Sequence, residues 1–553
     1  MSRLHFEPGS STRYRTGDWR RERAVYADRW PSCGAGCPAG EDIQAYLALA
    51  QAGQDEAAWR KLTEHNPFPA VCGRICPHPC ESACHRGALD EAVAIHRVER
   101  HLGDLAPARG WVHTAAAVAP GAPHIGIVGA GPAGLACAYH LARAGYRVTI
   151  YDAADEPGGA LRWGVPDYRL PKDALAREVD AVLALGVTLQ RGVRVGADIT
   201  AAALRDRHDA VFVAIGAGRA LSPVEADIDG HGVESGLAFL DRINRGERPD
   251  LPARVAVIGG GNTAIDVARC ARRLGATTVT IVSPQDRPGR RPSMPAEEMT
   301  ALPGEIVQAE AEGVSLLVRQ GVQRLVRSGA HLDGLQLAQV DHVFDDAGRF
   351  RPVLFAGTET FLPAGRVIVA TGQEVDWTGL DALRPDPAAG VFVGGDCGGG
   401  ARTAAHAIGG GRQAAEDIQA YLQARASRDL RRPATVTAEA LHLDYYRRIP
   451  RCPDAEADPS TRQRDFREVQ TGLDAAAAKT EAARCLSCGV CMACDNCWHF
   501  CPDAAVLKQG PGGPYVVDLD FCKGCGICAA ECPTGHIQMV PEADFDDRPR
   551  SPP

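Results

Sequence analysis

The chain has 553 residues and a formal net charge of −9, with 45% hydrophobic and 23% charged residues. At roughly 100–200 residues per domain, this length predicts about three to five domains, and the composition is typical of a soluble globular protein. The negative charge argues against a nucleic-acid-binding surface, and no run of roughly 18 apolar residues is present that could span a membrane. The N-terminus has no apolar secretory segment, so we expect a cytoplasmic protein.

The 20 cysteines are concentrated in two parts of the chain. Six lie between Cys33 and Cys84, and ten lie between Cys485 and Cys532. Dense groups at short fixed spacings, without an export signal, indicate metal sites in a reducing compartment rather than disulfides.

Residues 1–117 are predicted to form an arm followed by a helical, cysteine-rich domain. Residues 1–30 are polar and Arg-rich, as in an extended arm. Segments 41–53, 55–66 and 90–106 carry apolar residues at helical spacing, and the cysteines lie in Pro- and Gly-rich turns between them.

Residues 118–248 and 366–425 are predicted to form a first dinucleotide-binding domain. From His124 the chain reads as strand, glycine turn, helix and strand, with G-x-G-x-x-G spacing at the turn. The first glycine permits the tight turn, the second lets the backbone approach a pyrophosphate, and the third lets the helix pack on the strand. Asp152 ends the next strand, where it can accept from ribose hydroxyls. The three glycines are Gly129, Gly131 and Gly134.

Residues 249–365 are predicted to form a second domain of the same kind. Its turn reads Gly259-Gly-Gly261-Asn262-Thr263-Ala264. Ser283 rather than an acid ends the next strand, which removes one feature that favours NAD. Arg287, Arg290 and Arg291 follow, and any of them could meet a 2′-phosphate, although a solvated basic loop is an equal alternative. We therefore predict NADP(H) or NAD(H), with the balance toward NADPH.

Two such sites in one chain suit an enzyme that passes hydride between nicotinamide and flavin. The first site would hold FAD, and Gly395-Asp396 would supply a third contact, because a carboxylate at a strand end can accept from ribityl hydroxyls. The flavin and nucleotide domains contain no C-x-x-C, so a redox-active disulfide is not expected.

Residues 481–545 are predicted to form a ferredoxin domain with two [4Fe-4S] clusters, between a linker at 426–480 and a tail at 546–553. Two runs have x2, x2, x3 spacing and end in Cys-Pro, and in this pattern the fourth cysteine of each run ligates the other cluster. Structural zinc, which prefers two separated C-x2-C pairs, is the alternative. Cys485 and Cys488 extend the spacing backwards and could be alternative ligands, but we expect spare thiols. The predicted ligand sets are Cys491, Cys494, Cys497 and Cys532 for one cluster, and Cys522, Cys525, Cys528 and Cys501 for the other.

The N-terminal cysteines are Cys33 and Cys37, followed by Cys72, Cys76, Cys80 and Cys84 at x3 spacing. Six thiolates are enough for one [4Fe-4S] cluster, whereas a second would need a carboxylate or a ligand from outside the group. A zinc-bound or disulfide-stapled helical cap is the alternative. We therefore predict one N-terminal cluster and leave a second open.

Five segments then match one family in its order: VCGRICPHPCESAC, GAGPAGLACA, EPGGALRWGVPDYRLPK, VAVIGGGNTAIDVAR and VGGDCGGGARTAAHAIGGGRQAA. Over about residues 30–420 the chain resembles the glutamate synthase small (beta) subunit family. The appended cysteine runs resemble a sub-branch with a C-terminal ferredoxin module. That branch includes the iron–sulfur flavoprotein partner of dissimilatory sulfite reductase and the NADP-reducing subunit of 2-oxoacid:ferredoxin oxidoreductases.

The resemblance implies site residues in the N-terminal half. Cys37, Cys76, Cys80 and the carboxylate Glu99 would hold the cluster nearest the flavin, and Cys33 and Cys84 would belong to an outer cluster. Gly159 and Arg162 fall in a segment of the FAD site. The C-x2-C pair that the family places just before Cys33 is absent, because the segment reads YADRWPSC. The family's Tyr-Arg-Arg after the second nucleotide strand is also absent, replaced by Ser-Pro-Gln at 283–285.

These features predict an α/β protein with two Rossmann-like domains, a helical N-terminal iron–sulfur domain and a C-terminal α+β ferredoxin-like domain. The expected function is an NAD(P)H-dependent FAD oxidoreductase that exchanges electrons with a ferredoxin or a larger redox enzyme subunit, with oligomers possible. The small subunit of a glutamate synthase is the alternative. A third hypothesis, a non-catalytic scaffold, conflicts with the intact glycine turns.

Overall fold

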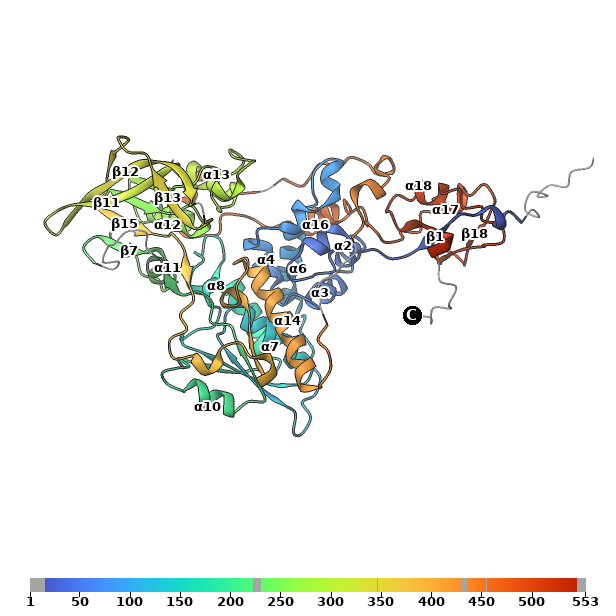
Figure 1. Cartoon of the computed structure of the whole chain (residues 1–553), viewed down its shortest axis with the longest axis horizontal. Coiled ribbons are helices and arrows are strands. Elements are labelled where there is room, and N and C mark those ends of the chain that lie inside the picture. The colour runs from blue at the N-terminus through green and yellow to red at the C-terminus, as the bar shows by residue number, and fades with distance from the viewer. Residues whose placement is uncertain (1–14, 222–229, 346, 429–434, 454, 545–553) are drawn as a thin grey trace, which may run out of the picture.

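A computed structural model of the chain shows four groups of elements joined by long loops (Figure 1). The structure describes residues 15–221, 230–345, 347–428, 435–453 and 455–544. The groups are a helical N-terminal region, two units built on parallel sheets and a small C-terminal unit, which confirms the predicted fold class. Residues 1–14 of the predicted arm and the predicted tail at 546–553 lie outside the described residues.

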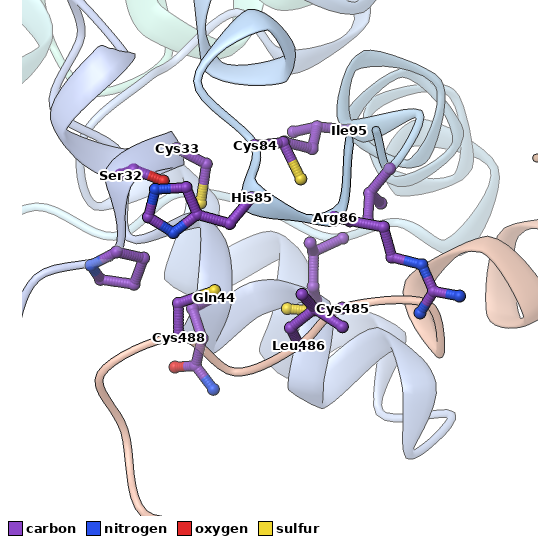
Figure 2. A pocket seen from close by; sticks show the side chains of 13 residues that line it. Ser32, Cys33, Gln44, Cys84, His85, Arg86, Ile95, Cys485, Leu486 and Cys488 are labelled. Atoms are coloured by element: carbon purple, nitrogen blue, oxygen red, sulfur yellow. The ribbon is translucent and has the colours of Figure 1, made fainter. Parts of the chain in front are cut away.

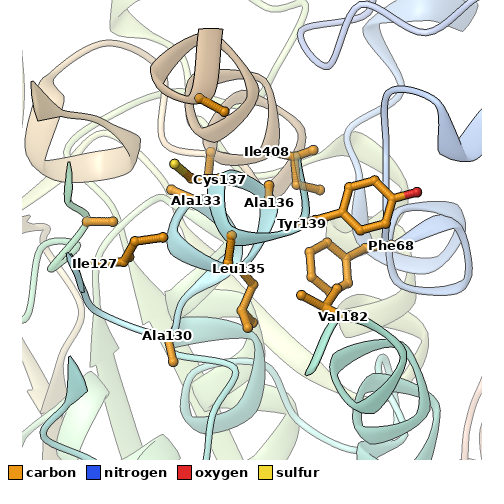
Figure 3. Close-up of a cluster of buried hydrophobic side chains, with 14 of the residues drawn as sticks. Phe68, Ile127, Ala130, Ala133, Leu135, Ala136, Cys137, Tyr139, Val182 and Ile408 are labelled. Carbon is orange, nitrogen blue, oxygen red and sulfur yellow. The ribbon is translucent and has the colours of Figure 1, made fainter. Parts of the chain in front are cut away.

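The first parallel sheet has the strand order β17-β5-β2-β3-β4. Its central strands are buried along almost their whole length, as expected for a sheet covered on both faces. Helix α7 (Pro132–Arg143) starts directly after the first glycine turn and packs against α14 (Ala404–Leu422) (Figure 3). The strands are β2 (His124–Val128), β3 (Arg147–Asp152), β4 (Thr188–Arg191), β5 (Ala210–Val213) and β17 (Val391–Val393).

The second parallel sheet has the order β10-β9-β8-β15-β7. It takes in β7 and β15, which lie within 118–248 and 366–425, the ranges predicted for the first domain. The second unit therefore starts at β7 rather than at residue 249, because a strand belongs to the sheet whose backbone it bonds. The strands are β7 (Val233–Ser235), β8 (Arg254–Ile258), β9 (Thr278–Val282), β10 (Val314–Leu317) and β15 (Arg366–Val369).

Helices and a second layer of strands cover this sheet. The helices are α11 (Gly236–Asn244), α12 (Asn262–Arg273) and α13 (Pro303–Ala311). An antiparallel sheet, which the sequence patterns did not predict, packs Leu335 and Leu337 against Ile258 and Val282 of the parallel sheet. Its strands are β11 (Gln320–Ser328), β12 (His331–Phe344), β13 (Phe350–Leu354) and β14 (Thr360–Pro363).

The N-terminal region is helical, as the apolar spacing predicts. Tyr46, Trp59, Leu62 and Leu102 come from three helices and form a buried core. Glycine and proline interrupt the pattern between the helices, so most of the cysteines fall at helix ends and turns, whereas Cys72 lies in the middle of α4. The helices are α1 (Ser32–Gly36), α2 (Ile43–Gln51), α3 (Asp55–Thr63), α4 (Pro69–Ile75), α5 (Pro79–Ser82) and α6 (Ile95–Arg109).

The predicted linker at 426–480 returns to this helical region. Helix α16 (Ala475–Ala482) packs against α2 and α6, and Ala482 belongs to their core. Arg484 just beyond it is completely buried. The segment therefore packs as part of the helical region, although it lies nearly 400 residues further along the chain.

The C-terminal unit contains the second group of cysteines and one strand from the other end of the chain. Strand β1 (Glu22–Tyr26) of the predicted arm pairs antiparallel with β20 (Ile537–Pro541) (Figure 1). The unit also contains α17 (Asn496–His499), β18 (Val506–Lys508), β19 (Tyr515–Val517) and α18 (Ile527–Ala530). Among the described residues, no helix is both long and apolar enough to cross a bilayer.

Candidate functional site

The first glycine turn joins β2 to α7 with very little space around its backbone. Gly129 has φ +106°, and a Cβ atom on it would lie 2.4 Å from the carbonyl oxygen of Ala214. A Cβ on Gly134 would lie 1.9 Å from the carbonyl oxygen of Gly129. A Cβ on Gly159 would lie 2.8 Å from the Cα of Gly131, so two bare backbones face each other there. Such a bare turn at a helix N-terminus suits the pyrophosphate of FAD.

Asp152 lies beside this turn, where the sequence places it. Its carboxylate accepts hydrogen bonds from the backbone N–H of Ala130 at 2.5 Å and of Ala154 at 2.7 Å. Burial raises the pKa of Asp152 above its ordinary value against the opposing effect of these bonds. Because a carboxylate has about four acceptor positions, ribose hydroxyls could still bind there.

The third predicted FAD contact also reaches α7. Gly395 has φ +67°, and a Cβ on it would lie 2.7 Å from the Cβ of Ala133. Burial raises the pKa of the neighbouring Asp396, with Arg402 acting against it. Arg162 donates to the carbonyl oxygen of Pro157 at 2.6 Å and pairs with Glu156, so it braces the loop that carries Gly159.

The second glycine turn joins β8 to α12 in the same way. A Cβ on Gly259 would lie 2.3 Å from the carbonyl oxygen of Ala370, whereas Gly261 is almost open. The side-chain oxygen of Asn262 accepts from the backbone N–H of Leu302 at 2.9 Å, which ties the helix start to the segment before α13. Thr263 follows on the same helix start, and Ala264 is fully buried. This turn suits a second dinucleotide.

The three arginines after the second nucleotide strand differ in their partners. Arg287 pairs with Glu310 at 2.5 Å, and Arg291 pairs with Glu297 at 2.9 Å. Arg290 is exposed, and its side chain has no ion pair among the described residues. Arg290 is therefore the one of the three whose charge is available to a 2′-phosphate.

Two cavities of the C-terminal unit are each lined by four cysteines. Their empty volumes, mouths included, are about 310 and 360 Å³. In each cavity, three cysteines come from one run and the fourth from the other, which is the crossed arrangement expected for two clusters. The first is lined by Cys491, Cys494, Cys497 and Cys532, and the second by Cys522, Cys525, Cys528 and Cys501.

The N-terminal cysteines form an inner group beside the first nucleotide unit. Cys37, Cys76 and Cys80 lie close enough to one another to interact electrostatically, and the buried Glu99 lies beside Cys37 and Cys76. The amide of Asn66 donates to Glu99 at 2.8 Å, and burial raises the pKa of this carboxyl well above its ordinary value. Cys72, which is not among the predicted ligands, is buried beside Glu99 and Cys76. Its position in the series of cysteines at x3 spacing is the sequence feature that points to it.

A third cysteine cavity joins the two ends of the chain (Figure 2). It has an empty volume of about 340 Å³. Its lining includes Cys485 and Cys488, which are the two cysteines predicted to be spare thiols. The four cysteines, hereafter the bridging site, are Cys33, Cys84, Cys485 and Cys488.

The remaining cysteines are not grouped with these sites. Cys137 and Cys270 are fully buried in the helices of the two glycine turns, as core residues. The Cys397 thiol donates to the carbonyl oxygens of Val213 and Gly394.

A family model described as pyridine nucleotide-disulphide oxidoreductase matches residues 123–411, slightly more than half of the chain. The chain belongs to this family. A model described as dihydropyrimidine dehydrogenase domain II, 4Fe-4S cluster, matches residues 22–111, and one described as 4Fe-4S binding domain matches residues 515–537.

Three curated proteins similar to this oxidoreductase carry the comparison further. The NADP(+)-dependent formate dehydrogenase subunit beta of Moorella thermoacetica is 36% identical over 500 residues, or 82% of this chain and 69% of that protein. The NADPH-Fe(3+) oxidoreductase subunit beta of Geobacter sulfurreducens is 32% identical over 517 residues, 82% of this chain and 74% of that protein. The glutamate synthase [NADPH] small chain of Escherichia coli is 31% identical over 439 residues, 72% of this chain and 91% of that protein.

The predicted resemblance to the glutamate synthase small subunit family is therefore confirmed. The oxidoreductase is an enzyme of the NAD(P)H-dependent FAD and iron–sulfur class, with 4Fe-4S domains at both ends of its nucleotide-binding units. The glycine turns and cysteine cavities are the parts of the chain that suit these cofactors.

Proposed function

We propose that this chain is the subunit of a redox system that oxidises a reduced nicotinamide nucleotide. Through its C-terminal unit, it exchanges electrons with a ferredoxin or a larger enzyme subunit. The observation that carries the proposal is one chain with two dinucleotide turns and a series of cysteine sites leading away from them. Cys491, Cys494 and Cys525 of the C-terminal unit are exposed, so a partner could approach clusters held there. Two of the similar proteins are named as beta subunits and one as a small chain, which supports a subunit role.

Different groups of residues would bind the different cofactors. When bound, FAD converts a two-electron hydride into single electrons, and [4Fe-4S] clusters carry those one at a time. The turn at Gly259 would hold the nicotinamide nucleotide, and the turn at Gly129 would hold FAD. Arg290 would favour NADPH over NADH by pairing with a 2′-phosphate. We propose Cys37, Cys76 and Cys80, with Glu99 or Cys72, as ligands of the cluster nearest the flavin.

Reductive titration of anaerobically purified protein tests the proposal. We expect NADPH, and less readily NADH, to bleach the flavin absorbance and then the broader iron–sulfur absorbance. If neither nucleotide bleaches the flavin while FAD and iron are both present, the nucleotide site is idle and the proposal fails.

A glutamate synthase small subunit is the second candidate, because the chain spans 91% of the E. coli small chain. That role does not require the C-terminal ferredoxin unit. Cys525→Ser distinguishes the two. Under our proposal it abolishes reduction of an added ferredoxin but spares NADPH-driven bleaching of the flavin. Under the second candidate, NADPH-dependent electron delivery to the protein's large subunit would be unaffected by the same substitution.

A further inference from the structure

The bridging site is assembled from three distant segments that meet in one cavity (Figure 2). Cys33 lies on α1 and Cys84 follows α5, whereas Cys485 and Cys488 follow α16. The rest of the lining is mixed, with the apolar Pro31, Leu47, Val93, Ile95 and Leu486 and the polar Ser32, Gln44, His85 and Arg86. The empty volume of about 340 Å³ lies between those of the two cavities in the ferredoxin unit, 310 and 360 Å³. Three cavities of similar volume, each lined by four cysteines, suit the same kind of occupant.

The thiols of the bridging site point into one shared space (Figure 2). Cys488 is buried, and Cys33, Cys84 and Cys485 are partly buried. Four cysteines grouped in this way suit a metal centre, because thiolates are the form that metals bind and a cationic centre offsets the repulsion between their charges.

A buried network holds the C-x2-C pair in this position. The Arg484 side chain pairs with Glu481 at 2.5 Å and with Asp90 at 3.2 Å. Arg86, two residues after Cys84, donates to the carbonyl oxygen of Arg484 at 2.7 Å. The short segments that carry Cys84 and Cys485 are thus bonded directly to each other.

The spacing of the sulfur atoms argues for a cluster rather than a single ion. Zinc binds four thiolates at about 2.3 Å, which would hold the sulfurs about 3.8 Å apart. Over the residues that the structure describes, only His78, Glu81 and His96 form a group of three or more potential ligands within 4.8 Å of one another. The sulfurs of the bridging site are therefore further apart than a lone zinc ion requires, as are those of the two ferredoxin cavities.

We propose that the four cysteines of the bridging site ligate a further [4Fe-4S] cluster, which links the helical region to the ferredoxin unit. The pair at Cys485 and Cys488 takes the place of the C-x2-C that the sequence lacks before Cys33. The outer N-terminal cluster is thus complete, but two of its ligands come from the opposite end of the chain.

Chain geometry places this cluster between its neighbours. Cys33 and Cys37, which belongs to the inner group, are separated by one turn of helix, about 6 Å along the axis. Cys488 and Cys491, which belongs to the ferredoxin unit, are three residues apart, so their Cα atoms are at most about 11 Å from each other. The bridging cluster then completes a path from the inner group to the C-terminal unit; this relay role, unlike the ligation, rests on the proposed function.

Metal analysis of a double variant tests the ligation. We expect Cys485→Ala combined with Cys488→Ala to lose about four iron and four sulfide per chain, with zinc unchanged. Cys452→Ala is the matched control, because Cys452 is a half-buried thiol on the segment that leads into α16 but lines none of the three cysteine cavities. Unchanged iron in the double variant, or loss of one zinc per chain, would overturn the proposal.

A measurement on the unmodified protein covers the case in which the variant does not fold. Anomalous diffraction from anaerobic crystals, recorded at the iron and zinc absorption edges, should show an iron peak between Cys33 and Cys488. A zinc peak alone, a disulfide or an empty cavity would contradict the cluster. Neither test depends on oxidation of a nicotinamide nucleotide. The proposed ligation can therefore be disproved while the proposed function stands, and the proposed function can be disproved while the ligation stands.

Discussion

At the scale of single residues, neighbouring arginines that look alike in the sequence have different surroundings. Glu310 and Glu297 neutralise Arg287 and Arg291, whereas Arg290 is exposed. A guanidinium that already has a carboxylate partner gains less from a phosphate, because the earlier ion pair must be broken first. Discrimination between the two nicotinamide nucleotides should therefore rest on Arg290.

We expect Arg290→Ala to raise the KM for NADPH by about tenfold or more, because a hydrogen bond to a charged group contributes about 1.5–3 kcal/mol. The KM for NADH should not change, since NADH has no 2′-phosphate. Steady-state kinetics with a dye acceptor measures both values, and Arg287→Ala is the control. An equal rise for both nucleotides would show that Arg290 does not recognise the phosphate.

At the scale of elements, one buried carboxylate joins the two helices behind the second nucleotide turn. Glu312 ends α13 and pairs with Arg269 and Arg273 of α12 at 2.8 and 2.6 Å. Arg462, on the segment that leads into α16, also lies 3.2 Å from the Glu312 carboxylate. Burial alone would raise the pKa of Glu312, but the bonds from Arg273 and Arg269 outweigh it and leave the pKa below its ordinary value.

We expect Glu312→Gln to lower the free energy of unfolding by about 3–5 kcal/mol, because it leaves the buried guanidinium group of Arg273 without its carboxylate partner, whereas Arg269 keeps Glu305. Glu310→Gln, two residues earlier in an ion pair that is one third exposed, should cost less than about 1 kcal/mol. Chemical denaturation followed by circular dichroism compares the two variants.

The Glu312 carboxylate also makes the difference in free energy of unfolding between the wild-type protein and Glu312→Gln depend on pH. Because its folded pKa is lowered, its stabilisation is present above the ordinary glutamate pKa of about 4.3 and is lost as the pH falls through the folded value. The gap between the wild-type protein and Glu312→Gln should therefore narrow in acid. A gap that widened in acid would mean that Glu312 is not the charged partner of these arginines.

At the scale of the whole molecule, the two ends of the chain meet twice. Strand β1 completes the C-terminal unit by pairing with β20, and Arg20 and Arg23 both bond the carboxylate of Glu542 beyond that strand. Further along, α16 packs against α2 and α6. Strand β1 of the predicted arm is therefore part of the ferredoxin unit.

Deletion of residues 1–26 should destabilise the C-terminal unit, because β20 loses its only strand partner among the described residues. We expect a lower iron content and faster proteolysis between residues 490 and 540. Deletion of residues 1–14, which keeps β1, is the control. If both truncated chains retain full iron content, β1 is dispensable for the unit.

Much of the site could be predicted from the sequence, because its chemistry depends on local spacing. A glycine turn between a strand and a helix, or a cysteine every third residue, brings its own atoms together within one or two turns of backbone. The turns at Gly129 and Gly259 and the crossed cysteine sets therefore appear in the structure where the sequence places them.

Only the tertiary structure decided which distant segments belong together. Strands β7 and β15 joined the second sheet, β1 joined the C-terminal unit, and the pair at Cys485 and Cys488 joined Cys33 and Cys84. Sequence periodicity does not predict which distant segments contact each other. Contacts across hundreds of residues are specified by the packing of whole surfaces and not by any local spacing. The sequence by itself thus determined the kinds of cofactor site, and the fold determined which residues complete them.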